Sequence, residues 1–113
     1  MKEIKAFVRV YKVDKIIDAL QDLGITDFTI TEVMGVGKHL EDLTDAEYSI
    51  EIIKKYSKIA KLELVCRADK VEKITTKLRQ VAYTGMKGDG IIYVTPVEKV
   101  IKIRTGAINS DAL

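Results

Sequence analysis

The sequence contains one cysteine and one histidine among its 113 residues, and this scarcity limits the chemistry open to it. A single cysteine, Cys66, cannot form an internal disulfide, which favours a reducing compartment, so we expect a cytoplasmic protein. One histidine and one cysteine are too few for a catalytic triad in convincing spacing, and no paired-carboxylate motif is present. The composition therefore predicts a protein that is not an enzyme.

Long apolar runs and a strong charge of one sign are also missing. No stretch approaches the roughly 18 apolar residues that a membrane helix needs. Residues 1–4 lead directly into an alternating segment and not into the apolar core of a signal peptide. The formal net charge of +2 argues against a dedicated nucleic-acid binder, for which a strongly basic surface is expected. We expect neither membrane insertion nor a nucleic-acid partner.

What the sequence does have is an uneven distribution of charge. Residues 39–53 include five acidic side chains and no lysine or arginine, so the rest of the chain is cationic. This pattern suits an anionic ligand in the body of the protein and a separate partner contact on the acidic segment. A merely solvated acidic loop explains the charge equally well.

Hydrophobic periodicity predicts four strands and two helices. Strands are expected at Lys2–Val10, Phe28–Val36, Lys58–Cys66 and Ile91–Thr95, the last closed by Pro96. Helices are expected after Asp14 and after Asp69, each of which could cap a first turn, and Gly24 should end the first helix. The inward positions are expected to be Ile4, Ala6, Val8, Val10, Ile16, Ile17, Leu20, Leu23, Ala60, Leu62, Leu64, Cys66, Val71, Ile74, Leu78 and Val81.

The order of these elements is strand-helix-strand, a long insert, then strand-helix-strand. Two similar halves in this order indicate one α+β domain over residues 1–113, a ferredoxin-like βαββαβ sandwich with both helices on one face of an antiparallel sheet. The other face needs a cover, and the simplest cover is another copy of the chain. The insert, about 38–57, is too long for a hairpin connection and its pattern fits a helix or a strand; we expect a flexible loop that orders on binding.

The most informative motif is TGMKGDG at residues 84–90, followed at some distance by Lys102 and Arg104. The three glycines make a flexible turn whose backbone amides could close around an anion. The two cations share one face of an extended segment, because side chains two residues apart point the same way. Such a combination can hold the phosphates of a nucleotide, although the glycine motif alone is more often only a turn.

Other segments of the chain match the same family pattern as this motif. They are TITEV at 29–33, GVGK at 35–38, AEY at 46–48, TPVE at 95–98 and IRTG at 103–106. In this order they make the chain similar to the PII signal-transduction (nitrogen regulatory P-II) family, as an atypical PII-like member. The resemblance implies a homotrimer that binds ATP or ADP in clefts between subunits. It also implies regulation of a transporter or metabolic enzyme through the long loop.

The resemblance further implies roles for individual residues. Those that would wrap the phosphates or reach them across the cleft are Gly88, Asp89, Gly90, Lys102 and Arg104. Those that would line the base of the loop or the adenine and ribose are Gly35, Gly37, Lys38, His39, Thr29, Glu63 and Val65. Tyr48 matches the context of a nucleotidylation site, and we expect it rather to anchor a partner.

Three positions depart from the family pattern. Ile91 stands where a phosphate-binding lysine is usual, so ATP would be held more weakly or less distinctly from ADP. His39 and Ile59 stand where a glutamine and a lysine are associated with Mg²⁺ and 2-oxoglutarate, and Mg²⁺ prefers oxygen ligands. We therefore expect an energy sensor that does not respond to 2-oxoglutarate, with a role for Mg²⁺ left open.

Three alternatives stay open from the sequence. They are a conventional 2-oxoglutarate-responsive nitrogen regulator, a small ferredoxin-fold enzyme, and a structural or metal-handling trimer with a disused cleft. Residues 35–38 lack the spacing of a Walker A loop, so a P-loop ATPase is not supported.

Overall fold

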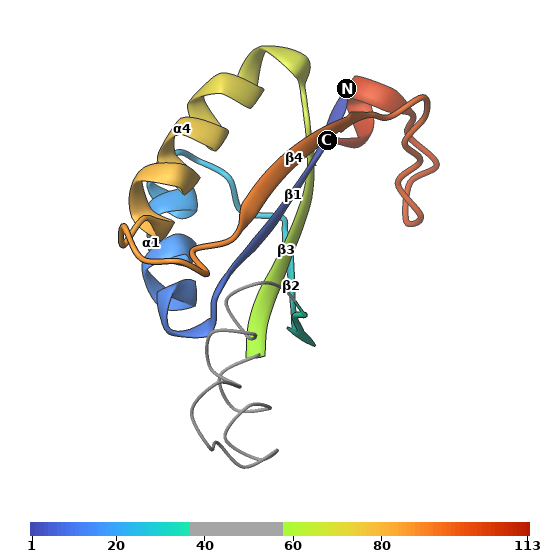
Figure 1. Cartoon of the computed structure of the whole chain (residues 1–113). Helices are drawn as coiled ribbons and strands as arrows, with labels where there is room; N and C mark the ends of the chain where they lie inside the picture. The colour runs from blue at the N-terminus through green and yellow to red at the C-terminus, as the bar shows by residue number, and fades with distance from the viewer. Residues whose placement is uncertain (37–57) are drawn as a thin grey trace.

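Alternating apolar residues build a four-stranded antiparallel sheet. The computed structural model describes residues 1–36 and 58–113 (Figure 1). Within this part the strands are β1 (Lys2–Arg9), β2 (Thr29–Met34), β3 (Lys58–Cys66) and β4 (Ile91–Pro96), in the spatial order β2-β3-β1-β4. Each neighbouring pair runs antiparallel. The predicted ferredoxin-like sheet is therefore confirmed.

Every second side chain of β1 and β3 is buried. Ile4 lies opposite Leu64 and Ala6 opposite Leu62, and none of the four is more than 3% exposed. Full burial of a leucine-sized side chain stabilises the fold by about 1.5–3 kcal/mol. These central strands therefore hold the rest of the sheet in place.

Both helices lie side by side on one face of the sheet, as expected (Figure 1). They are α1 (Val13–Asp22) and α4 (Val71–Ala82). The buried side of α1 includes Ile16 and Leu20, and that of α4 includes Ile74 and Leu78. Gly24 ends α1 with φ 81°. Its amide bonds the Gln21 carbonyl at 2.9 Å, and the next amide bonds the Leu20 carbonyl, also at 2.9 Å. This is the Schellman arrangement that a helix-terminal glycine favours.

The predicted helix caps Asp14 and Asp69 are wrong. A 3₁₀ turn precedes each helix: η1 (Val10–Lys12) before α1 and η2 (Ala68–Lys70) before α4. Each helix begins at the end of its turn, after Lys12 or Lys70, and neither capping position has a side-chain hydrogen bond. Asp14 thus lies inside the first helical turn, where its charge still favours the positive end of the helix dipole.

The inward position predicted for Val10 is also wrong. β1 ends at Arg9, so Val10 belongs to the 3₁₀ turn and is 39% exposed. The strand therefore ends one residue before the predicted end.

The chain after β4 forms a small hairpin that projects from the sheet near both termini (Figure 1). Ile101 pairs with Ile108, the Lys102 amide donates to the Ala107 carbonyl at 2.8 Å, and the chain closes with η3 (Asn109–Ala112). No helix in residues 1–36 and 58–113 is long and apolar enough to cross a membrane. The predicted insert, about 38–57, lies outside the described residues.

Candidate functional site

The glycine-rich turn at residues 84–90 runs from the end of α4 directly against β1. Gly90 has φ 107°, and a Cβ atom there would lie 1.7 Å from the backbone oxygen of Phe7. Backbone cannot move aside as the end of a flexible side chain can, so this position requires glycine. The turn is therefore seated on the sheet at the beginning of β4.

The carboxylate of Asp89 organises the turn from inside. Its Oδ2 accepts the amides of Thr84 at 2.8 Å and Gly85 at 2.9 Å, and its Oδ1 accepts the Thr84 hydroxyl. The Met86 amide in turn donates to the Thr84 hydroxyl oxygen at 3.1 Å. The Thr84 hydroxyl, followed by the backbone amides, holds the pKa of Asp89 well below its usual range. The side chain thus closes the turn as a fixed negative charge.

Arg9, at the end of β1, attaches this turn to the sheet. Its Nε donates to Asp89 Oδ1 at 3.1 Å, and its Nη2 donates to the Lys87 carbonyl at 2.8 Å. Sequence reasoning missed Arg9, because nothing near it in the sequence indicates a partner 80 residues away.

Not all of the turn's amides are used by this network. The backbone amides of Thr84 and Gly85 donate hydrogen bonds to Asp89, and that of Met86 donates to the Thr84 hydroxyl oxygen. Among the described residues, no hydrogen bond takes the amide of Gly88 or Gly90. Amides of this kind in a glycine-rich turn can meet an anion.

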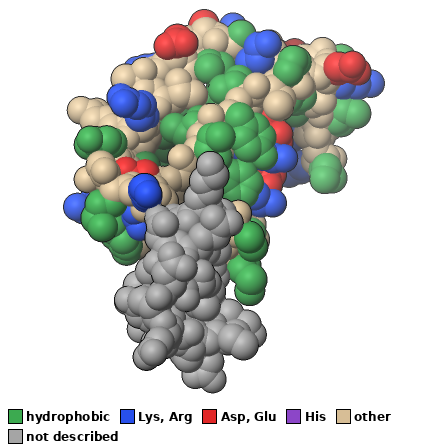
Figure 2. Space-filling model, in the orientation of Figure 1, with side chains coloured by type: hydrophobic (Ala, Val, Ile, Leu, Met, Phe, Trp, Pro, Cys, Tyr) green, Lys and Arg blue, Asp and Glu red, His purple; other side chains and the backbone are tan. Residues whose placement is uncertain are grey.

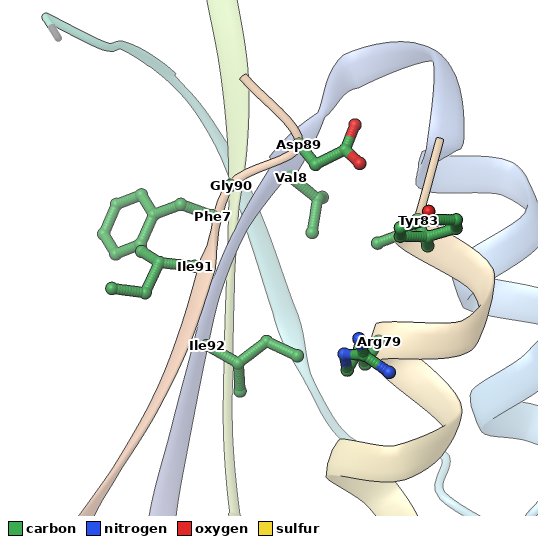
Figure 3. Close-up of a pocket in the computed structure, with 9 residues that line it drawn as sticks. Phe7, Val8, Arg79, Tyr83, Asp89, Gly90, Ile91 and Ile92 are labelled. Atoms are coloured by element: carbon green, nitrogen blue, oxygen red, sulfur yellow. The ribbon is translucent and has the colours of Figure 1, made fainter. Parts of the chain in front are cut away.

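A hollow of about 370 Å³ lies behind the turn, between β4 and the end of α4. Figure 3 shows Val8 and Ile92 pointing into it from the strands, with Arg79 of α4 and Tyr83, directly after that helix, opposite. Phe7 and Ile91 point to the other side of the sheet (Figure 3). There the Phe7 ring stacks on Tyr93 with the centroids 5.9 Å apart. The turn thus stands at the border between a lined hollow and an aromatic surface.

A second hollow, of about 460 Å³, gathers the three residues predicted near adenine and ribose. Thr29 lies directly opposite Glu63, and Val65 follows on the same face of β3. Lys61 lies 2.9 Å from the Glu63 carboxylate, and this hydrogen bond lowers the pKa of Glu63. The hollow therefore offers carboxylate acceptors, from Glu63 and also from Glu3 and Asp27, beside polar and apolar side chains.

The two hollows share no lining residue and lie at different places on the sheet. Thr29 is on edge strand β2 and the glycine turn precedes edge strand β4, so three strand spacings, about 14 Å, separate them. Lys102 and Arg104 lie elsewhere again, on the projecting hairpin, where both are exposed. Within the part of the chain that the structure describes, the predicted residues therefore fall into separate groups.

Of the remaining predicted site residues, the structure describes only Gly35. Gly35 follows β2. Ile59 of β3, one of the positions that depart from the family pattern, lies opposite Val33 of β2. Four predicted residues lie outside the described part of the chain: Gly37, Lys38, His39 and Tyr48. No group of three potential metal-ligating side chains occurs in residues 1–36 and 58–113. Cys66 is buried, as predicted, and its burial raises the pKa of the thiol.

Comparisons with known proteins agree on one family. A model described as "Nitrogen regulatory protein P-II" matches residues 1–107. Proteins of that name from Azospirillum brasilense and Pasteurella multocida (strain Pm70) are each 40% identical over 116 aligned residues, covering all of both chains. The one from Nostoc punctiforme is 37% identical over the same full length. P-II proteins are signalling regulators and not enzymes; they bind nucleotides, form oligomers and act on partner proteins. The chain belongs to the nitrogen regulatory P-II family of signal-transduction proteins.

Proposed function

We propose that this chain assembles as a homotrimer and binds ATP or ADP in clefts between its protomers. The observation that carries the proposal is the division of the predicted ligand residues. The glycine turn, the Thr29–Glu63 hollow and the Lys102–Arg104 hairpin lie at three separate places on one protomer. A cyclic assembly presents one protomer's turn to the next protomer's hollow, and so can complete the site.

The exposed apolar surface supports an assembly. Ile103 on the hairpin is 99% exposed, and large apolar side chains of β4 are also exposed. Figure 2 shows hydrophobic side chains gathered in the middle of one face of the body. Contiguous exposed apolar surface marks an interaction site more often than a free surface.

The proposed output is regulation of a transporter or metabolic enzyme in the cytoplasm through residues 38–57. The turn at 84–90 and the end of β2 would contact the phosphates. Because ATP and ADP differ there by one phosphate, each nucleotide would favour a different conformation of residues 38–57. Only a difference in binding free energy between two states can shift their populations, and about 1–3 kcal/mol is typical. Because His39 and Ile59 stand where a glutamine and a lysine are associated with 2-oxoglutarate, we propose that the response follows adenylate state and not 2-oxoglutarate.

Calorimetric titration with ATP and with ADP, each with and without Mg²⁺ and 2-oxoglutarate, tests the ligand. Adenylate binding that ignores 2-oxoglutarate supports the proposal. Tightening by 2-oxoglutarate would identify a conventional nitrogen sensor, and no adenylate binding would favour a structural or metal-handling trimer.

Mixed assemblies test whether the site is shared between protomers. One variant carries Glu63→Ala in the hollow and the other Gly88→Ala in the turn. Each homotrimer should lose binding, whereas a random equimolar mixture should regain about one quarter of the sites, namely those that combine two intact halves. A mixture that regains none would place the site within single protomers.

A further inference from the structure

The guanidinium of Arg9 makes contacts at both sides of the turn's last bend. It bonds the side chain of Asp89 at 3.1 Å and the backbone carbonyl of Lys87 at 2.8 Å. The pair is partly buried, with the Arg9 and Asp89 side chains 22% and 23% exposed. A planar guanidinium can reach two acceptors in fixed directions, whereas a lysine ammonium on its flexible stem cannot fix both. The arrangement therefore sets the orientation of the bend and not only its position.

Charge gives Arg9 a second role. Asp89 places a carboxylate at the centre of a turn that, in the function proposed above, receives phosphates. Like charges a few ångströms apart repel, and the repulsion grows where water is partly excluded. The Arg9 cation at 3.1 Å offsets the Asp89 charge. Without it, the Asp89 carboxylate would lose the cation that lies 3.1 Å from it, close to the amides that face an anionic ligand.

We propose that Arg9 is a positioning residue for the phosphate end of the nucleotide site. It holds the backbone that carries the Gly88 and Gly90 amides, and it cancels the charge of the carboxylate that closes the turn. This inference rests on the proposed nucleotide function. It concerns a side chain that acts through Asp89 and Lys87 rather than by touching the ligand.

The chain contains a matched control for this residue. Arg67 comes directly after β3 and, like Arg9 at the end of β1, directly precedes a 3₁₀ turn; its φ is −67° and its ψ 147°, against −65° and 136° for Arg9. Its side chain is exposed and makes no hydrogen bond or ion pair among the described residues. Arg67→Ala therefore removes an arginine from the same local backbone without touching the turn.

The test compares ATP and ADP affinity, by calorimetry, in the wild type and in the Arg9→Ala, Arg9→Lys and Arg67→Ala variants. We expect Arg9→Ala to weaken ATP binding about tenfold or more, and the loss to shrink at high salt because the uncompensated charge is then screened. Arg9→Lys should recover the charge-dependent part of the affinity only. Arg67→Ala should bind like the wild type. A purely structural role for Arg9 would not change the salt dependence.

Hydrogen exchange of the Thr84 and Gly85 amides in the nucleotide-free protein gives an independent measurement. Exchange should accelerate in Arg9→Ala, because their acceptor Asp89 is no longer held. Faster exchange with unchanged ATP affinity would overturn the inference, as would equal affinity in all variants. If the wild type itself binds no adenylate, the proposed function fails, and with it the role of Arg9 toward a nucleotide. Arg9→Lys keeps the test available if Arg9→Ala does not fold.

Discussion

Gly90→Ala should destabilise the protein strongly, because the new methyl group would meet backbone. The added Cβ would lie 1.7 Å from the Phe7 oxygen and 2.8 Å from its carbonyl carbon, and φ 107° is unfavourable for any residue with a side chain. Backbone strain of about 1–3 kcal/mol and overpacking of about 1–3 kcal/mol together predict a loss of roughly 2–6 kcal/mol. The turn would have to lift away from β1.

Urea denaturation at fixed protein concentration measures this loss. With a slope of about 1–3 kcal/mol/M, the midpoint should fall by roughly 2 M. Gly106→Ala is the control, because Gly106 also has a positive φ, 71°, but nothing lies within 4 Å of its added Cβ. Gly106→Ala should lose only the strain contribution, about 1–3 kcal/mol. Equal losses at the two glycines would refute the close approach of the turn to β1.

Three further predictions concern the core and the turn. Leu62→Ala should lower the free energy of unfolding by about 2–5 kcal/mol, because Leu62 is 1% exposed and its truncation leaves a cavity in the core. A free energy of unfolding within about 1 kcal/mol of the wild-type value, from denaturant titration, would contradict this. The folded pKa of Asp89 lies below the unfolded value of about 3.9, so its stabilisation is complete above about pH 5 and is lost as the pH falls below about 4. The stability difference between wild type and Asp89→Asn, followed by thermal melting against pH, should therefore shrink in acid, and a difference independent of pH down to 2 would argue against it. Cys66 should react with a thiol reagent only after unfolding, because burial raises the pKa of its thiol; rapid labelling of the folded protein would show that β3 opens.

The bounds of strand β3 could be predicted from the sequence. Its predicted bounds, Lys58–Cys66, agree with the structure, because an apolar residue occupies every second position from Ala60 to Cys66. The helix starts were less predictable. Asp14 and Asp69 are good capping residues by type, but a 3₁₀ turn of three residues displaces both from the capping position. Local propensity could not show that turn.

The candidate site was predictable in composition but not in construction. The glycines of the turn are visible as a motif, whereas the bond from Arg9 to Asp89 joins residues 80 positions apart. Similarly, Thr29 and Glu63 meet only through the register of β2 on β3. Contacts of this kind depend on tertiary structure, so one sequence alone does not reveal them.

The central place of β1 also affects how the chain can fold. Lys2 lies opposite Cys66 in β3 on one side and opposite Pro96 in β4 on the other. The first strand of the chain therefore pairs with the last strand, β4. Pairings between such distant segments slow folding, because the long intervening chain must be closed first. During synthesis the N-terminal strand emerges early and remains without its β4 neighbour until residue 96 has left the ribosome. Until then its open edge is exposed to other chains, a condition that favours misassembly.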